Sequence, residues 1–254
     1  SVGALGSNTT GGNNTAIGYS ALYANTTASN NTAVGHTALY SNTTGTRNTA
    51  TGAAALGTNT TSSDNTAFGA NALSVTTGSS NTGVGSYALF LNTTGEYNTS
   101  IGANSVSNTT TGNYNSGVGF FSLYSNTTGN YNTALGYQTL FTSQTGYNNT
   151  AVGAQALLSN TTAANNTAVG YQAGYSNTTG GITALGNSAG YGNTTGTANI
   201  ALGSAALQTN STGSYNVAVG QQALQVATTA TSNIAVGAYT LLTATTGSNN
   251  VAIG

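Results

Sequence analysis

Hydroxyl-bearing, small and larger aliphatic residues alternate in a short phrase that recurs along all 254 residues of the chain. The phrase reads NTALG at residues 132–136, and the glycine that closes it returns every 17 residues, or after 16 on two occasions. These glycines are Gly18, Gly35, Gly52, Gly69, Gly85, Gly102, Gly119, Gly136, Gly153, Gly170, Gly186, Gly203, Gly220, Gly237 and Gly254. A fixed short period predicts a stack of similar units in which each unit contacts its neighbours.

The hydrophobic pattern within one unit predicts a strand. We number each unit from the asparagine that opens the phrase, so that the consensus reads NTAVGYQALYSNTTGNY. Position 2 is Thr or Ser as far as Thr183 and is Ile or Val from Ile200 onward, while position 4 is aliphatic or Phe in every unit except at Thr51. Such residues two apart predict a strand whose positions 2 and 4 face the core. The small residue at position 3 is then expected to face outward.

The rest of the unit predicts how the strand is closed into a coil. Leu at position 9 in most units, preceded by a small residue at position 8, predicts a second strand around positions 7 to 10. Glycine at position 5 and NTTG at positions 12 to 15 supply corners, and their frequency opposes helix. The chain is thus predicted to be an all-β parallel β-solenoid of about fifteen coils with a 17-residue repeat, continuous over residues 1–254. Because it opens and stops inside the phrase, we expect a segment of a longer fibre.

Repeat positions whose residue types vary little bear on how the chain assembles. Positions 8 and 9 would face opposite sides of a regular strand, so either the chain bends between them or the outer face is covered by another copy. The small residues at position 3 favour the second interpretation and predict a face for self-association into a homotrimer or a filament. The alanines of this face are Ala16, Ala33, Ala50, Ala67, Ala134, Ala151, Ala168, Ala184, Ala201, Ala218, Ala235 and Ala252.

Composition narrows the chemistry. The chain has one Lys or Arg, two Asp or Glu, one His and no Cys, which gives no basic surface for nucleic acid or anionic lipid. No apolar run is long enough to cross a membrane. His36, Asp64 and Glu96 cannot form a catalytic pair or a metal cluster within one chain, so we expect no catalytic, cofactor or metal site. Arg47 and Asp64 share position 17 in neighbouring units and should form an exposed ion pair.

Asparagines form two columns. At position 1 the asparagine either passes amide hydrogen bonds from coil to coil or simply starts the strand after a turn. At position 12 it opens an N-x-S/T pattern that predicts a stripe of glycans, although the same residues also suit a turn. The predicted glycosylation sites are Asn8, Asn25, Asn42, Asn59, Asn92, Asn126, Asn160, Asn177, Asn193 and Asn210.

Tyrosine is the one enriched aromatic residue. Tyr97, Tyr114 and Tyr131 share position 17 in consecutive units, and Tyr215 occupies it further on. Such a column either binds sugars or a neighbouring filament, or the rings only stack on each other.

The phrases NIALG, NVAVG, NIAVG and NVAIG, which begin at Asn199, Asn216, Asn233 and Asn250, resemble the head repeats of YadA-type trimeric autotransporter adhesins. Similar NTAVGYQAL repeats occur in tail-fibre-like proteins. The resemblance implies a left-handed parallel β-roll, association of three chains and a role as a surface adhesin. This chain departs from the family by its inserted LYSNTTG arm and by its near lack of charge.

These patterns together predict a non-enzymatic, extracellular fibrous protein: the body of a surface appendage, an adhesin head or stalk, or a virion tail fibre. Its expected partners are further copies of itself, with glycans or a host surface beyond them. The alternative is an ice-binding or carbohydrate-binding β-solenoid. The threonines at positions 13 and 14 are adjacent, however, and do not form two rows on one flat strand, which weighs against ice binding.

Overall fold

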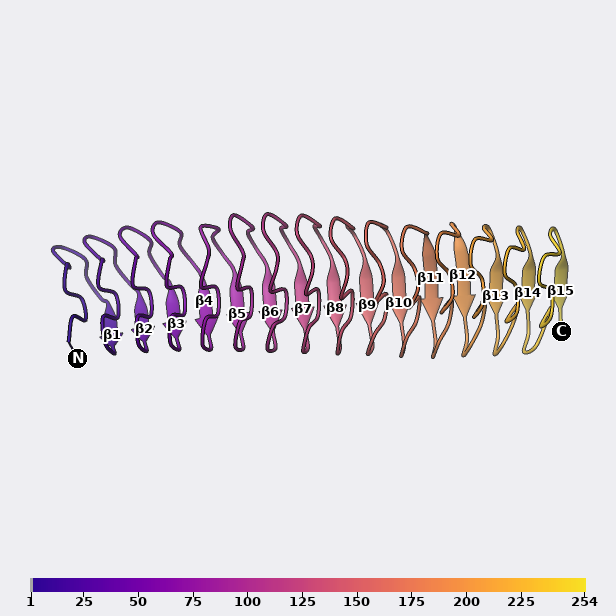
Figure 1. The fold of residues 1–254 in the computed structure, drawn as a ribbon, viewed down its shortest axis with the longest axis horizontal. Helices are drawn as coiled ribbons and strands as arrows, with labels where there is room; N and C mark the ends of the chain where they lie inside the picture. Colours follow the sequence, from indigo (N-terminus) through magenta and orange to yellow (C-terminus); the bar gives the residue numbers. More distant parts are fainter. Residues whose placement is uncertain (1) are drawn as a thin grey trace. The chain divides into compact units, whose positions relative to one another are not determined.

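The computed structural model describes residues 2–254, which divide into two compact units, residues 2–129 and 130–254. Within each unit, parallel strands stack in chain order, and no helix occurs in the described residues (Figure 1). The strands of the first unit are β1 (Thr15–Ile17), β2 (Thr32–Val34), β3 (Thr49–Thr51), β4 (Thr66–Phe68), β5 (Thr82–Val84), β6 (Thr99–Ile101) and β7 (Ser116–Val118). Those of the second unit are β8 (Thr133–Leu135), β9 (Thr150–Val152), β10 (Thr167–Val169), β11 (Ile182–Leu185), β12 (Asn199–Leu202), β13 (Val217–Val219), β14 (Ile234–Val236) and β15 (Val251–Ile253). The predicted all-β parallel solenoid with its 17-residue spacing is confirmed.

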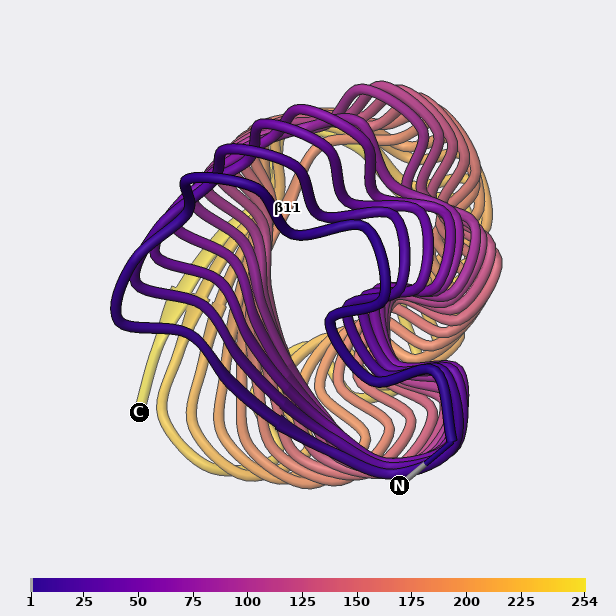
Figure 2. The ribbon, with the colours of Figure 1, turned by 90° about the vertical axis from the view of Figure 1, so that its left-hand side faces the viewer.

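The strands pair so that each repeat position stacks on the same position of the next coil. In the first unit Ala33 pairs with Ala50, and in the second unit Ala201 pairs with Ala218. Figure 2 looks along the stacks and shows that, within each unit, successive coils are turned and shifted slightly. Each column of equivalent side chains therefore follows a gently twisted path, as parallel strands normally do.

The two faces of the strand are the reverse of the prediction. Position 3 is buried, as at Ala50 and Ala201, whereas positions 2 and 4 lie on the outer face. The reason is the width of the coil. The leucine at position 9 already fills the interior, and a Cβ added at Gly83 of position 3 would lie 3.3 Å from Cγ of Leu73. The core therefore accepts only small residues at position 3, and the larger β-branched residues must point outward.

The predicted second strand is absent, because positions 6 to 11 form turns. Positions 7, 9 and 17 adopt left-handed backbone conformations, for example Leu22 with φ 51° and Asn30 with φ 63°. This conformation costs a non-glycine residue about 1–2 kcal/mol. The left-handed residue lets the chain bend so that Ala21 and Leu22 both point into the core, each with 0% exposure. The bend interpretation of positions 8 and 9 is thus confirmed.

Glycine at position 5 makes the corner that follows the strand. These glycines have φ between 119° and 142°, a region that side chains disfavour. The corners also touch: a Cβ added at Gly203 would lie 2.6 Å from the carbonyl carbon of Gly220 in the next coil. The contact explains why every coil has glycine here.

Candidate binding and assembly surfaces

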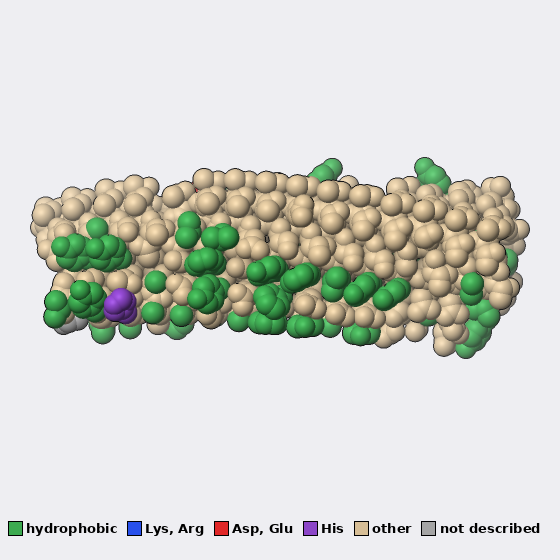
Figure 3. Space-filling view, in the orientation of Figure 1, with side chains coloured by type: hydrophobic (Ala, Val, Ile, Leu, Met, Phe, Trp, Pro, Cys, Tyr) green, Lys and Arg blue, Asp and Glu red, His purple; other side chains and the backbone are tan. Residues whose placement is uncertain are grey.

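The outer strand face carries a column of exposed aliphatic and aromatic side chains at position 4. Ile17 is 60% exposed, Phe68 53% and Leu135 46%. Figure 3 shows another side of the coils, on which the one histidine lies and further hydrophobic side chains gather mostly in the lower half of the view. Apolar residues that are exposed or partly exposed in successive coils, with Thr51 as the exception, are unusual on an isolated soluble protein and mark a surface for contact.

Beside it, position 2 forms a second column with unusual hydrogen bonding. In the described structure, no hydroxyl of this column, from Thr15 to Thr183, donates to or accepts from another protein group. The threonines at position 13 differ, because their hydroxyls bond to carbonyls of the next coil, as Thr43 Oγ1 does to Thr60 O at 3.0 Å. The position 2 hydroxyls are therefore open to water or to another molecule.

The face changes chemistry within the second unit. In β12 to β15, position 2 is Ile200, Val217, Ile234 or Val251, so both outer columns are aliphatic. Four consecutive strands thus present an outer strand face without hydroxyl groups at positions 2 and 4.

The structure contradicts the prediction that the position 12 asparagines carry glycans. Nine of the ten asparagines, all except Asn8, have 0% exposure. Their side-chain nitrogens are already engaged: Asn42 Nδ2 donates to Gly45 O at 2.9 Å and to Asn25 Oδ1 at 3.2 Å. An N-linked sugar on these nitrogens would have to enter the core. The turn interpretation holds for position 12, with an amide ladder inside the coil.

The position 1 asparagines form a second ladder, which confirms the coil-to-coil interpretation. Asn48 donates from its backbone N to Asn31 Oδ1 at 2.9 Å and from Nδ2 to Ser62 O at 2.8 Å. In the second unit Asn216 makes the same bonds to Asn199 Oδ1 and Ala230 O, at 3.0 and 2.8 Å. Each of these asparagines ties its own coil closed through Nδ2 and joins it to the preceding coil through its backbone N–H.

The structure also contradicts the prediction that the position 3 alanines form an assembly face. Ala33, Ala50, Ala67, Ala134, Ala151, Ala168, Ala184, Ala201, Ala218 and Ala235 are at most 1% exposed, while Ala16 and Ala252 lie in the outermost coils and are partly exposed. They fill the core and offer no surface. Any contact face on this side of the coil consists of positions 2 and 4.

The predicted ion pair is present. Arg47 Nε donates to Asp64 Oδ1 at 2.6 Å and Arg47 Nη2 to Asp64 Oδ2 at 2.7 Å, with both side chains largely exposed. The hydrogen bond, together with the opposite charge, lowers the pKa of Asp64 and raises that of Arg47. The pair joins two coils on the surface and has no further polar partner in the described residues.

Aromatic side chains stack along the coils, as the second interpretation of the tyrosine column predicts. Tyr97 and Tyr114 are parallel within 3° at a centroid distance of 4.9 Å. Equivalent pairs elsewhere are Tyr23 with Tyr40, Tyr175 with Tyr191, and Tyr19 with His36. Stacking occupies the ring faces between partners. Binding of sugars or of a neighbouring filament by this column stays a prediction.

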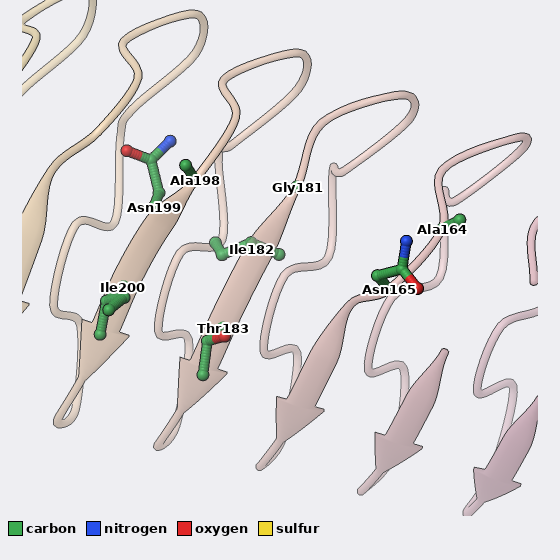
Figure 4. Close-up of a pocket in the computed structure, with 8 residues that line it drawn as sticks. All are labelled: Ala164, Asn165, Gly181, Ile182, Thr183, Ala198, Asn199 and Ile200. Atoms are coloured by element: carbon green, nitrogen blue, oxygen red, sulfur yellow. The ribbon is translucent and has the colours of Figure 1, made fainter. Parts of the chain in front are cut away.

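The second unit has a surface hollow of about 310 Å³, the Gly181 hollow. It is lined by Ala164, Asn165, Gly181, Ile182, Thr183, Ala198, Asn199 and Ile200. Figure 4 shows Asn165 on one side of Gly181 and Ala198 and Asn199 on the other, with Thr183 and Ile200 toward the arrowheads of β11 and β12. The hollow lies where the coil is one residue short, so no position 17 side chain fills the column at Gly181.

Comparison with protein-family models and with curated proteins gives no match. The adhesin resemblance and its left-handed roll therefore stay predictions. In the part of the chain that the structure describes, no helix is long and apolar enough to span a membrane. His, Asp and Glu side chains in the same residues form no group of three that could hold a metal ion.

Sequence reasoning missed both the exposed aliphatic column and the Gly181 hollow. The signal for the first was size, because positions 3 and 8 accept only small residues and therefore belong to a narrow interior. The signal for the second was the 16-residue step before Gly186, which coincides with Ile182, the one departure from asparagine at position 1 of a full unit.

Proposed function

We propose that this chain is a non-enzymatic structural β-solenoid that associates with further copies of itself through the outer strand face. The observation that carries the proposal is the exposed aliphatic column at position 4, which repeats in register from coil to coil. In this role the chain forms part of an extracellular appendage, an adhesin head or stalk, or a tail fibre.

Several properties of the face support association. Burying apolar surface contributes about 25 cal/mol per Å², so a column that repeats along many coils gains free energy in proportion to its length. Only four side chains in the whole sequence are Arg, Asp, Glu or His, so little charge opposes the approach of a second copy. The open hydroxyls of position 2 lie beside the aliphatic column and offer hydrogen bonds across the contact.

The interior supports a mechanical role. Within each unit, backbone pairing and two amide ladders, which are interrupted at residues such as Thr109 and Ile182, join each coil to its neighbours. Bending the stack would strain many of these bonds at once, so the coils resist it.

A second candidate function, ordering of water or ice, is favoured by the unpartnered hydroxyls of position 2. These hydroxyls recur at about 4.8 Å in a single row on the strand face, and the row beside it at position 4 is mainly aliphatic. An ice plane is flat, however, and the twist of each unit in Figure 2 lets only a few neighbouring coils match it. We therefore place self-association first.

The test replaces Val152, Val169 and Leu185 of position 4 together by Lys. Three exposed threonines of position 14 in consecutive coils provide the control, Thr162→Lys, Thr179→Lys and Thr195→Lys. Sedimentation should show that the parent and the control associate while the position 4 variant stays a single chain.

Sedimentation of the parent as a single chain at every concentration would overturn the proposal. Thermal hysteresis in that same single chain, lost when Thr133, Thr150 and Thr167 are replaced by Lys, would support water ordering instead.

A further inference from the structure

The coil that contains Gly181 breaks a hydrogen-bond pattern that its neighbours keep. In those neighbours the backbone N–H at position 17 donates to the carbonyl at position 16 of the preceding coil. Asn165 N bonds to Tyr147 O at 3.1 Å, and Tyr215 N to Thr197 O at 3.0 Å. Ala198 has no such bond, because Gly181 O accepts instead from Asn199 N at 3.2 Å. The missing residue therefore leaves the pattern open at the hollow.

Three backbone groups at the hollow can still form hydrogen bonds with another molecule. The N–H groups of Gly181 and Ala198 make no hydrogen bond with the described chain. Ala164 O, which would accept from position 17 of the next coil, receives only a long bond of 3.4 Å from Asn166 Nδ2. Two donors and one acceptor thus lie on one short stretch of surface.

Side chains extend this polar set and add an apolar wall. Asn165 Oδ1 accepts from Asn148 Nδ2 at 3.2 Å, while its own Nδ2 makes no bond to the protein. Thr183 adds an unpartnered hydroxyl, as its position 2 relatives do. Ile200 is 37% exposed and supplies an apolar surface, with Ile182 buried beneath at 3%.

The charge of the surroundings limits the ligand. Residues 130–254 contain no Asp, Glu, Lys, Arg or His, so nothing there would compensate a charged ligand. A volume of about 310 Å³ lies at the lower end of small-molecule sites. The occupant should therefore be small and neutral, should both donate and accept hydrogen bonds, and should have an apolar side.

We propose that the Gly181 hollow binds one residue of a neutral saccharide. Neighbouring hydroxyl oxygens of a sugar would accept from the N–H groups of Gly181 and Ala198 and from Asn165 Nδ2, and a sugar hydroxyl would donate to Ala164 O. The C–H face of the ring would rest on Ile200. The site goes beyond the structural role proposed above and occurs once in the second unit, where the repeat is one residue short.

The experiment titrates the whole chain with two neutral trisaccharides, chitotriose and maltotriose, by ligand-observed NMR and calorimetry. The structure predicts saturable binding of at least one of them with a dissociation constant of about 1 mM or tighter. Ala198→Tyr should abolish binding, because position 17 accepts Tyr at Tyr215 with a similar φ and the ring would fill the hollow. Ser232→Tyr, in the same column but outside the hollow, is the matched control and should bind as the parent does.

A second variant inserts one asparagine after Gly181 and restores the 17-residue step. It should recover the hydrogen bond to Ala164 O, fold at least as stably as the parent and lose the saccharide. The proposal is overturned if neither trisaccharide binds at about 10 mM, or if binding survives in both variants. Sedimentation of the same proteins separates this result from self-association, since Ala198→Tyr leaves the position 4 column intact.

Discussion

The side chain of Ile182 occupies the place in the core that a side chain at Gly190 would need. Ile182 replaces the position 1 asparagine, and Gly190 replaces the position 9 leucine of the same coil. Gly174 of the preceding coil also lacks that leucine, and a Cβ added there would lie 3.6 Å from Cγ2 of Ile182. The inward isoleucine thus fills the space that the leucine of its own coil vacates and, together with Leu157, borders the space at Gly174.

This exchange predicts strong coupling between the two sites. Gly190→Leu alone should destabilise the chain by about 1–3 kcal/mol, because the added side chain meets Ile182. Combining it with Ile182→Asn should recover much of that loss by restoring the usual pair of residues. A double-mutant cycle measured by chemical denaturation tests the coupling, and simple additivity of the two changes would contradict it.

The position 12 ladder has a gap that can be repaired. Asn92 Oδ1 and Thr109 Oγ1 are buried without hydrogen-bond partners, because Thr109 stands where the ladder requires an asparagine. Thr109→Asn should supply a donor to Asn92 Oδ1 and raise the free energy of unfolding by about 1 kcal/mol. The control repeats the change in an Asn92→Ala background. An equal gain there would show that the stabilisation does not come from this bond.

The reversed strand faces predict unequal effects of the same charge on neighbouring residues. Ala218→Asp places a carboxylate in the core, where Ala218 has 0% exposure, and should cost several kcal/mol. Val217→Asp lies on the outer face and should cost about 0.5 kcal/mol or less. Thermal unfolding of a non-associating background, such as the position 4 lysine variant, measures both. A larger loss for Val217→Asp would restore the inward assignment of position 2.

At leucines with a left-handed backbone, replacement by glycine should destabilise the fold no more than replacement by alanine, the reverse of the usual order. At Leu207, buried with φ 50°, both Ala and Gly remove the side chain from the core. Alanine keeps a Cβ that disfavours this backbone by about 1–2 kcal/mol, whereas glycine does not. We therefore expect Leu207→Gly to be no more destabilising than Leu207→Ala. Gly174 and Gly190, which occupy position 9 in their own coils, support this expectation. Ala206→Gly, at the preceding position, should be destabilising in the ordinary way.

Stability should respond little to pH. Asp64 has a lowered pKa, so the ion pair stabilises the fold above the unfolded-state pKa of about 3.9, and this contribution is lost as pH falls through the lower folded-state value. Residues 130–254 contribute no acidic, basic or histidine side chain. The thermal midpoint should therefore be nearly constant between about pH 5 and pH 9 and should fall slightly in acid. Asp64→Asn should remove that small fall, and a fall of the same size in this variant would assign it to another group.

The sequence predicted the coil length and the strand position, because each depends on a period that the chain repeats, and it offered the amide ladder of position 1 as one of two interpretations. It did not predict which face of the strand is inside. Val219 and Ala218 are both compatible with a strand, and hydrophobicity favours burial of the valine. The structure buries the alanine because the interior is too narrow for more.

The turn at positions 6 to 11 escaped prediction for a different reason. Leucine rarely adopts a left-handed conformation, so Leu22 and its equivalents favoured a strand. Only the packing of both Ala21 and Leu22 into the core compensates the strained backbone. The hollow at Gly181 also depends on tertiary structure, although the 16-residue step marked its place in the sequence.

The side-chain amide ladders have a direction. The later coil donates and the earlier coil accepts, from Asn25 to Asn8, from Asn42 to Asn25 and from Asn210 to Asn193. A ribosome releases the amino end first, so every new coil would meet a finished one whose acceptors are already fixed in place. The direction of the ladders thus suits folding from the amino end, in which each folded coil provides the hydrogen-bond acceptors for the coil that follows.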